Sequence, residues 1–424
     1  MNSSDSIKDS SSGGAATGTL PVPWKIKAGL STLYFLTYLG LGIYWTYGNV
    51  YFSEIGVSVG EIGILNALYF GVAIFGHPFF GYMYDKSSHK HKAIGIVAVL
   101  AAVTGFLIPS HTRVFSRAVV YALFSLFSSS LMPLMDAGTL VWCSDNQVPF
   151  QSVRLWGTLG YLFSSILGGT ILERVDLVWS YYIPAIVLIL MFGLILRFNK
   201  ARWLPCNAVS GSLSATISLK DVKAVVTSRA FLQLLLIAFL FRVAFTGPLS
   251  LFTVYLDHRG LSASQIGYVM MIGGLSEAII LIGKKGFFDY FSGESLLSMA
   301  IVLSGIRWFL TVSIKSYPWF LLLQLIHGTN FMLFYLVAVE KTNRLFPAEL
   351  TGVGQTVFGS VFYGLGPVIG SLAGGMMVQD MGYSKSFRIC AVMCWCVGFL
   401  QILLSRKSKR AGKMIRDKES SVSV

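Results

Sequence analysis

The sequence predicts an all-α membrane protein, with twelve transmembrane helices arranged in two pseudo-symmetric six-helix bundles. Three observations support this fold class. Of the 424 residues, 54% are apolar and only 12% are charged, whereas about 25% of the residues of a soluble protein are charged. Apolar runs of about 20 residues, long enough to cross a bilayer core about 30 Å thick, recur along the chain. The two halves of the chain also share a repeated sequence pattern.

The apolar runs give the predicted spans in chain order. The longest polar interruption, at residues 199–228, separates six runs from six others. The remaining loops are too short for a second soluble domain, so we expect the whole molecule to be the membrane domain. The predicted spans are 27–52, 61–82, 93–110, 116–142, 152–172, 177–197, 230–256, 264–284, 294–314, 318–339, 350–378 and 384–404.

These spans divide the chain into five parts. Residues 1–24 are rich in Ser and Gly and lack the apolar core of a signal peptide and the arginines of a transit peptide, so we expect a disordered cytoplasmic tail. An N-terminal six-helix bundle at 25–198 is joined by a cytoplasmic linker at 199–228 to a C-terminal bundle at 229–405. Residues 406–424 form a basic cytoplasmic tail.

The placement of the basic residues predicts the topology. The 33 Lys and Arg residues and 19 Asp and Glu residues give a net charge of +14. The basic residues lie in short loops between apolar runs, which argues against a nucleic-acid-binding protein. Roughly two dozen lie on the side that holds both termini and about seven on the other, so the positive-inside rule places both termini in the cytoplasm. We expect the plasma membrane, with an organelle membrane as the alternative.

Motifs for enzymatic activity or for a cofactor are missing from the sequence. HEXXH, GXSXG and phosphate-loop patterns do not occur. Cys390, Cys394 and Cys396 lie on one apolar helix, where cysteine behaves as a small hydrophobic residue. We therefore expect no enzyme, no metal and no organic cofactor.

An internal repeat relates the two halves. Residues Val50 to Gly63 read VYFSEIGVSVGEIG, and residues Val254 to Gly267, 204 positions later, read VYLDHRGLSASQIG. The same offset relates Asp85 to Asp289. The match indicates a duplication, although shared turn chemistry is an alternative explanation. Two repeats related by an axis along the membrane normal are a transporter design, with the solute held between the halves near the midplane.

At this point the residues resemble the major facilitator superfamily. The turn GYMYDKSSHKHK, from Gly81 to Lys92, is similar to the family's loop between the second and third spans, with Ser88 and His89 in place of the usual Gly-Arg ending. An acid at a helix end can engage helix termini and basic groups of the neighbouring bundle. The resemblance therefore implies a cytoplasmic gate formed by Asp85, Lys86 and Asp289.

Within the superfamily, the chain looks most like the branch of lactose permease and the phenylpropionate permeases. The stretch from Val153 to Gly169 is similar to the fifth-span signature of that branch. Residues Ile306 to Leu336 resemble its ninth and tenth spans, and Phe346 to Gly375 resemble its eleventh. The resemblance covers most of the chain and implies a secondary transporter.

Ionisable residues inside the membrane are costly and are therefore candidates for function. Asp136 and Arg154 are 18 residues apart, a spacing that in the lactose permease pattern separates the acid and the arginine that bind the solute. A salt bridge that only joins two helices is the alternative. Tyr161 lies where that pattern has an aromatic residue stacked on the solute. We also expect Trp156 and Asn49 to line the same cavity.

The second half holds candidates for proton coupling. Arg307 and His327 match the arginine and histidine of that branch, and His changes charge readily near neutral pH. Packing without proton transfer is the alternative for His327. We expect Glu277 to carry the proton, because a partly desolvated carboxyl can hold a proton at working pH. Asn330, which replaces the carboxylate of the family pattern, is placed with the solute-binding residues; Gly274 replaces the family's binding glutamate.

Arg242 has no counterpart in the resemblance. It either pairs with Glu277 or adds positive potential for an anionic solute. The five residues Asp136, Arg154, Arg242, Glu277 and Arg307 carry a slight positive excess, which favours an anion over a neutral sugar.

The sequence therefore predicts a secondary active transporter that moves a small polar or anionic organic solute by alternating access, as a proton-coupled symporter. The alternatives are an uncoupled facilitator, a non-transporting receptor or scaffold with the same fold, and a channel-like or lipid-moving protein. We expect the solute, protons and membrane lipid as partners, no nucleic acid, and a monomer.

Overall fold

The computed structural model describes residues 24–198, 223, 225–347 and 350–422, with the side chains of 198, 284–289 and 407–422 excepted. Residues 1–23 of the tail predicted at 1–24, most of the predicted linker and the side chain of Asp289 lie outside this part of the chain. Every regular element within it is helical. The predicted all-α membrane class is confirmed at this level.

Helices of the first half correspond to the first six predicted spans. Ser58 begins the second of them with a capping box, in which the Ser58 hydroxyl accepts from the Glu61 amide and the Glu61 carboxylate accepts from the Ser58 amide. The elements of this half are α1 (Trp24–Glu54), α2 (Val59–Lys86), α3 (Lys90–Leu107), η1 (Ile108–Ser110), α4 (Val114–Asp145), α5 (Phe150–Leu172) and α6 (Trp179–Phe198).

The second half repeats the local structure of the first. Ser262 and Gln265, 204 positions after Ser58 and Glu61, form an equivalent pair of capping hydrogen bonds. The repeat in the sequence is therefore matched by a repeated helix start. The elements of this half are α8 (Arg229–Ser250), α9 (Phe252–His258), α10 (Ala263–Tyr290), α11 (Gly293–Ser313), α12 (Tyr317–Leu325), α13 (His327–Leu345), α14 (Thr351–Gly359), the π-helix η4 (Ser360–Leu365) and α15 (Gly366–Val422).

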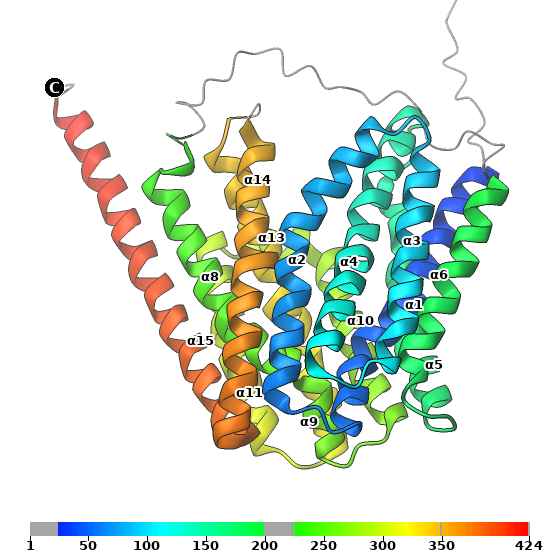
Figure 1. Cartoon of the computed structure of the whole chain (residues 1–424). Coiled ribbons are helices and arrows are strands. Elements are labelled where there is room, and N and C mark those ends of the chain that lie inside the picture. The colour runs from blue at the N-terminus through cyan, green and yellow to red at the C-terminus, as the bar shows by residue number, and fades with distance from the viewer. Residues whose placement is uncertain (1–23, 199–222, 224, 348–349, 423–424) are drawn as a thin grey trace, which may run out of the picture.

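Eleven helical segments in the described part are long and apolar enough to cross a membrane. Ten coincide with the predicted spans that precede residue 350. The eleventh, Thr351–Arg406, has 56 residues and contains both remaining predicted spans. It is interrupted at Gly382, whose φ of 77° is one that glycine adopts without strain. Figure 1 shows the chain descending before this point and rising after it.

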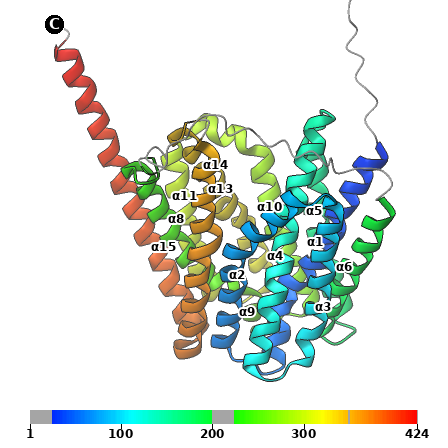
Figure 2. The ribbon, with the colours of Figure 1, turned by 45° about the horizontal axis from the view of Figure 1, so that its top comes forward.

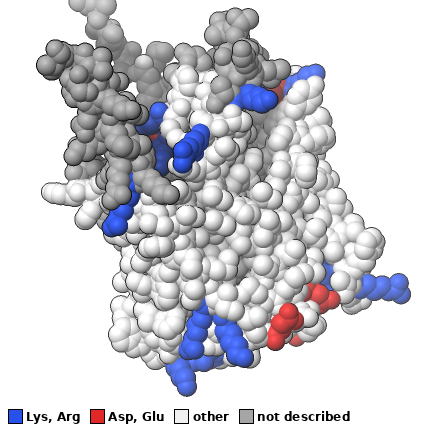
Figure 3. Space-filling model, turned by 90° about the vertical axis from the view of Figure 1, so that its left-hand side faces the viewer, with Lys and Arg blue, Asp and Glu red and all other residues white. Residues whose placement is uncertain are grey.

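Charged side chains on the outer surface leave an apolar band between them. Figure 3 shows Lys, Arg, Asp and Glu near the two ends of the molecule and none across the middle of the face in view. This distribution matches a hydrocarbon core flanked by two polar interfaces. We call the end at which α1 begins and α15 ends the terminal face, and the end with the turns 55–58 and 259–262 the opposite face (Figures 1 and 2).

Small residues bring the two halves together near the opposite face. The halves meet where α2 packs on α15 and α5 packs on α10. A Cβ atom on Gly63 would lie 2.7 Å from Gly375 Cα, and one on Gly267 would overlap the Ser165 carbonyl oxygen. No larger residue fits these backbone contacts, so glycine sets the distance between the halves.

Hydrogen bonds reinforce this contact. The Tyr47 hydroxyl donates to the carbonyls of Ser165, at 2.7 Å, and Ala263, at 3.1 Å. Asn49 Nδ2 donates to the Ser250 carbonyl at 3.0 Å. Within the described residues, the hydrogen bonds that join the halves all lie between the midplane and the opposite face, so the molecule is closed there.

Glu173, just after α5, adds a charged contact to the closure. Its carboxylate accepts from the Ser264 amide, at the start of α10, at 3.1 Å. A carboxylate is favoured at a helix N-terminus, where amide groups lack partners. The hydrogen bond from the Ser262 side chain, followed by those from Ser264, holds the pKa of the Glu173 carboxyl below its usual value.

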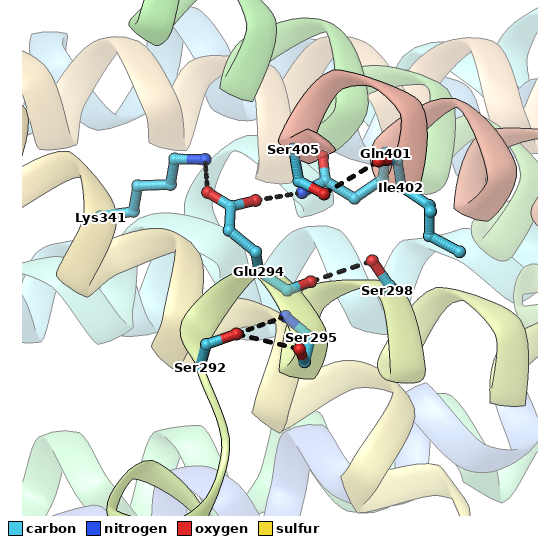
Figure 4. A network of polar contacts seen from close by, with 8 residues as sticks. All are labelled: Ser292, Glu294, Ser295, Ser298, Lys341, Gln401, Ile402 and Ser405. Carbon is cyan, nitrogen blue, oxygen red and sulfur yellow. Dashed lines mark hydrogen bonds and ion pairs between the residues drawn. The ribbon is translucent and has the colours of Figure 1, made fainter. Parts of the chain in front are cut away.

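A polar network joins three helices of the second half near the terminal face (Figure 4). Glu294, at the start of α11, accepts from Lys341 of α13 at 2.5 Å and from Gln401 of α15. The Glu294 carbonyl also accepts from Ser298 at 2.9 Å. One carboxylate therefore holds the terminal-face ends of α11, α13 and α15 together.

We predict that Gly63→Leu separates the two halves at the opposite face. A leucine side chain at this position would collide with the backbone of α15, where a Cβ atom alone already lies too close to Gly375. Spin labels at Ile55 and Met381, both exposed near that face, should report a larger fraction of long distances in the variant.

The matched control is Gly81→Leu on the same helix, where a Cβ meets no atom within 4 Å. Gly81→Leu should leave the distance distribution unchanged. Identical distributions for the two variants would contradict the proposed role of Gly63.

We predict a measurable loss of stability for Glu294→Gln, because Lys341 would lose its charged partner. The expected loss is about 1 kcal/mol, seen as a lower apparent Tm in detergent. Glu340→Gln is the control, since the one ion pair of Glu340 among the described side chains is with Arg344, four residues along the same helix, and Arg344 is 76% exposed. The control should cost no more than about 0.5 kcal/mol. Equal losses would show that the network has no special role.

Candidate functional site

Four side chains form a polar cluster inside the first half. The Tyr34 hydroxyl donates to Asp136 Oδ1 at 2.5 Å, and Arg154 Nε lies 3.8 Å from the same oxygen. Arg154 Nη2 also donates to the Tyr38 hydroxyl, and its guanidinium lies 4.4 Å from the centre of the Tyr38 ring. The structure therefore brings together Asp136 of α4 and Arg154 of α5, with two tyrosines of α1 beside them.

This cluster is only partly buried. The side chains of Arg154 and Asp136 are 30% and 36% exposed. A guanidinium donates in a planar fork, and a carboxylate accepts from hydroxyl or amine groups. The pair can therefore bind a polar solute without disruption of a packed core.

Aromatic rings lead from this cluster to the second half. Tyr38 contacts Trp45 edge-on at 5.8 Å, and Trp45 lies 6.5 Å from Tyr161. The Trp45 indole donates to the Tyr69 hydroxyl at 3.2 Å, which fixes its orientation. Tyr161 then reaches the second half, where a Cβ on Gly274 would lie 2.9 Å from the Tyr161 ring.

A cavity of about 90 Å³ lies beside Tyr161. Glu277, Arg307 and His327, predicted as proton-coupling residues, all line it. His327 Nε2 lies 3.1 Å from Glu277 Oε1, and Arg307 Nη2 donates to Gln324 Oε1 at 2.7 Å. The full lining is Tyr161, Leu249, Met270, Gly273, Gly274, Glu277, Arg307, Gln324 and His327.

Packing holds His327 in place. Its ring stacks on Phe245 at 6.0 Å and on Phe331 at 6.3 Å. The next amide, that of Gly328, donates to the Ser276 hydroxyl at 2.8 Å and so fixes α13 against α10. His327 can exchange a proton with Glu277 without a change of rotamer, because the two side chains are already in hydrogen-bond contact.

Arg242 and Asn330 do not line this cavity. Arg242 is 3% exposed, its Nε donates to the Phe362 carbonyl at 2.8 Å, and its guanidinium lies 4.8 Å from the Phe362 ring. The ion-pair partner of Glu277 is His327 and not Arg242. Asn330 is fully buried. We therefore leave Arg242 and Asn330 out of the proposed binding site.

Trp156 and Asn49 also lie apart from the cavity. Trp156 is 46% exposed and faces a groove against Trp24 and Thr32 of α1. Tyr161 follows it by five positions, which places the two on different sides of α5. Asn49 takes part in the closure between the halves, through Asn66 and Ser250.

The predicted cytoplasmic gate is only partly described. Asp85 and Lys86 end α2 at the terminal face and are exposed. The Lys86 ammonium lies 4.7 Å from the Tyr82 ring, and neither Asp85 nor Lys86 has an ion-pair partner among the described side chains. Since the side chain of Asp289 lies outside the described part, the gate stays a prediction.

Sequence reasoning missed Tyr34, Tyr38, Trp45 and Gln324. Tyr34 and Tyr38 are four residues apart and so share one face of α1, a spacing that is visible in the sequence. Trp45 follows on the same helix one turn before Asn49. Nothing in the sequence singled out Gln324, since its role depends on the position of Arg307.

A membrane protein of many helical spans, with charged side chains in the interior of each half, has the architecture of a transporter. The chain belongs to the MFS_1 like family, whose sequence model matches residues 28–389. The family match confirms the resemblance to major facilitator superfamily transporters.

Individual relatives are distant but cover nearly the whole chain. The chain is 24% identical to the maltose permease of Geobacillus stearothermophilus, over 89% of this chain and 94% of that protein. It is 23% identical to the probable 3-phenylpropionic acid transporter of Escherichia coli strain K12, over 87% of this chain and 95% of that protein. The crystal structure of the nucleoside transporter NupG superposes with a TM-score of 0.78 at 16% identity, covering 89% of this chain and 98% of that one.

We predict that Tyr161→Leu impairs transport and that Trp156→Leu does not. Tyr161 lines the cavity between the halves, whereas Trp156 lies on another side of the same helix. The measurement is the initial rate of solute uptake into proteoliposomes, with the amount of reconstituted protein matched. A loss of uptake in Trp156→Leu as large as that in Tyr161→Leu would contradict the placement of the site.

Proposed function

We propose that the chain is a secondary active transporter that moves a small polar or anionic organic solute by alternating access, with proton symport. The observation that carries the proposal is the position of two ion pairs, Asp136–Arg154 in one half and Glu277–His327 in the other. The aromatic path through Trp45 and Tyr161 connects them. Charged pairs in the interior of a membrane protein mark solute and proton pathways.

The topology follows from the break at Gly382. We propose that the segment Thr351–Arg406 crosses the membrane twice, which gives twelve crossings in two bundles and places both termini on the terminal face. The excess of basic residues in the loops of that side makes it cytoplasmic. The plasma membrane is the proposed location, and the proposed oligomeric state is a monomer.

Alternating access requires the closure at the opposite face to open in a second state. The closure depends on backbone contacts at Gly63 and Gly267 and on a few hydrogen bonds. Such contacts can separate as rigid surfaces without unfolding either half. We propose that the described state is the one closed to the outside.

Protons enter this cycle through Glu277 and His327. A proton on the pair changes the net charge beside the solute, so binding of the proton and binding of the solute are linked. An uncoupled facilitator is the second candidate, because Asn330 cannot titrate where the lactose permease pattern has a carboxylate. A receptor would bind solute without flux.

The names of the relatives support an organic solute. Maltose, 3-phenylpropionic acid and nucleosides appear in the names of proteins that this chain resembles over most of its length. All three are small organic molecules with polar groups. We propose a substrate within that range of size.

Radiolabelled uptake into proteoliposomes tests the proposal. With pooled sugars, nucleosides and carboxylates, we expect saturable uptake that an inward proton gradient stimulates, and that the double variant Asp136→Asn, Arg154→Gln abolishes. Equal uptake with and without the gradient would indicate the facilitator. Solute binding without any uptake would overturn the transporter proposal in favour of the receptor.

A further inference from the structure

Arg307 is a buried charge that lines the cavity without a carboxylate partner. Its side chain is 1% exposed, and no described carboxylate lies within ion-pair distance of it. One terminal nitrogen donates to Gln324, and the other, Nη1, has no acceptor among the described residues. An unpaired buried charge is unfavourable, so this position favours an arriving anion.

The surroundings of Arg307 define the kind of anion. The cavity volume of about 90 Å³ limits the group that binds beside Arg307 to a small one. A planar carboxylate matches the geometry of guanidinium donors. It also carries one negative charge, which balances the one charge of Arg307.

Arg242 shows by contrast what makes Arg307 a binding residue. Both arginines are buried, and both have an Nη1 without a partner among the described residues. Both also pack on aromatic rings, Arg242 on Phe362 at 4.8 Å and Arg307 on Trp308 at 4.1 Å. They differ in that Arg307 lines the cavity and Arg242 does not. Of these two arginines, a solute in the cavity can reach only Arg307.

This inference rests on the proposed function. We infer that the transported solute carries a carboxylate and that Arg307 binds this carboxylate in the cavity. A proton on the Glu277–His327 pair accompanies it. The remainder of the solute lies toward Tyr161 and the aromatic path.

The proton requirement follows from the charges that line the cavity. With Glu277 ionised and His327 neutral, Glu277 and Arg307 balance each other, and a second carboxylate would be repelled by Glu277. A proton bound by the pair leaves one positive charge, which the carboxylate neutralises. Among the described side chains, the charged and titratable groups that interact with Glu277 are His327, Arg307, Arg242, Tyr161 and Tyr363.

The test is thermal unfolding of the purified full-length protein in detergent with matched pairs of probes. Benzoate and acetate carry a carboxylate, and benzamide and acetamide are their neutral counterparts. At about 10 mM probe we expect the carboxylates to raise the apparent Tm and the amides to have no effect, because only a ligand that binds the folded state stabilises it.

Variants show which residues the stabilisation by carboxylates depends on. Arg307→Gln should weaken carboxylate binding at least about tenfold, as expected for loss of a charged hydrogen bond. Arg242→Gln should retain the response. Glu277→Gln should bind carboxylates with an affinity that depends less on pH than the affinity of the wild-type protein. If Arg307→Gln does not fold, the comparison of carboxylates with amides on the wild-type protein still tests whether the protein binds a carboxylate.

Three results would overturn the inference. The first is that no carboxylate raises the apparent Tm. The second is that carboxylates and amides raise it equally, and the third is that inorganic phosphate raises it as much as the carboxylates do. If any of these results were found together with saturable uptake of a neutral sugar or nucleoside in the liposome assay, the proposed transporter function would still hold. Only the binding of a carboxylate by Arg307 would be rejected.

Discussion

The contact between Glu277 and His327 is the interaction on which the rest of the site depends. Ionisable side chains inside an apolar protein are costly, and an oppositely charged or hydrogen-bonding partner lowers that cost. Their separation of 3.1 Å lets one proton be shared, and Phe245 and Phe331 hold the histidine ring in position. Arg307 lines the same cavity, and in the proposed cycle the protonation of the pair decides whether that cavity favours an anion.

The glycine contacts between the halves close the molecule on one side of these charged residues. Gly63 and Gly267 let backbone approach backbone near the opposite face, and Tyr47 and Asn49 add hydrogen bonds there. The cavity beside Tyr161 lies between the same halves. A movement that separates the glycine contacts therefore changes access to the charged residues, which links the fold to the proposed transport cycle.

Much of the fold was predictable, because each apolar run needs one bilayer crossing and basic residues collect in the loops. The same sequence predicted that Glu277, His327 and Arg307 act together, and they share one cavity. It did not separate Tyr161 from Trp156, since both are aromatic residues of one helix and only rotation about its axis distinguishes them. It also overlooked Tyr34 and Tyr38, whose importance depends on packing against Asp136 and Arg154.

Proton movement driven by the solute would show whether the Glu277–His327 pair couples the two. A pH-sensitive dye inside proteoliposomes would follow the internal pH after a transported solute is added outside, with no pH gradient imposed. We expect acidification in the wild-type protein and none in Glu277→Gln. Solute uptake without acidification in the wild-type protein, or equal acidification in Glu277→Gln, would contradict the role given to the Glu277–His327 pair.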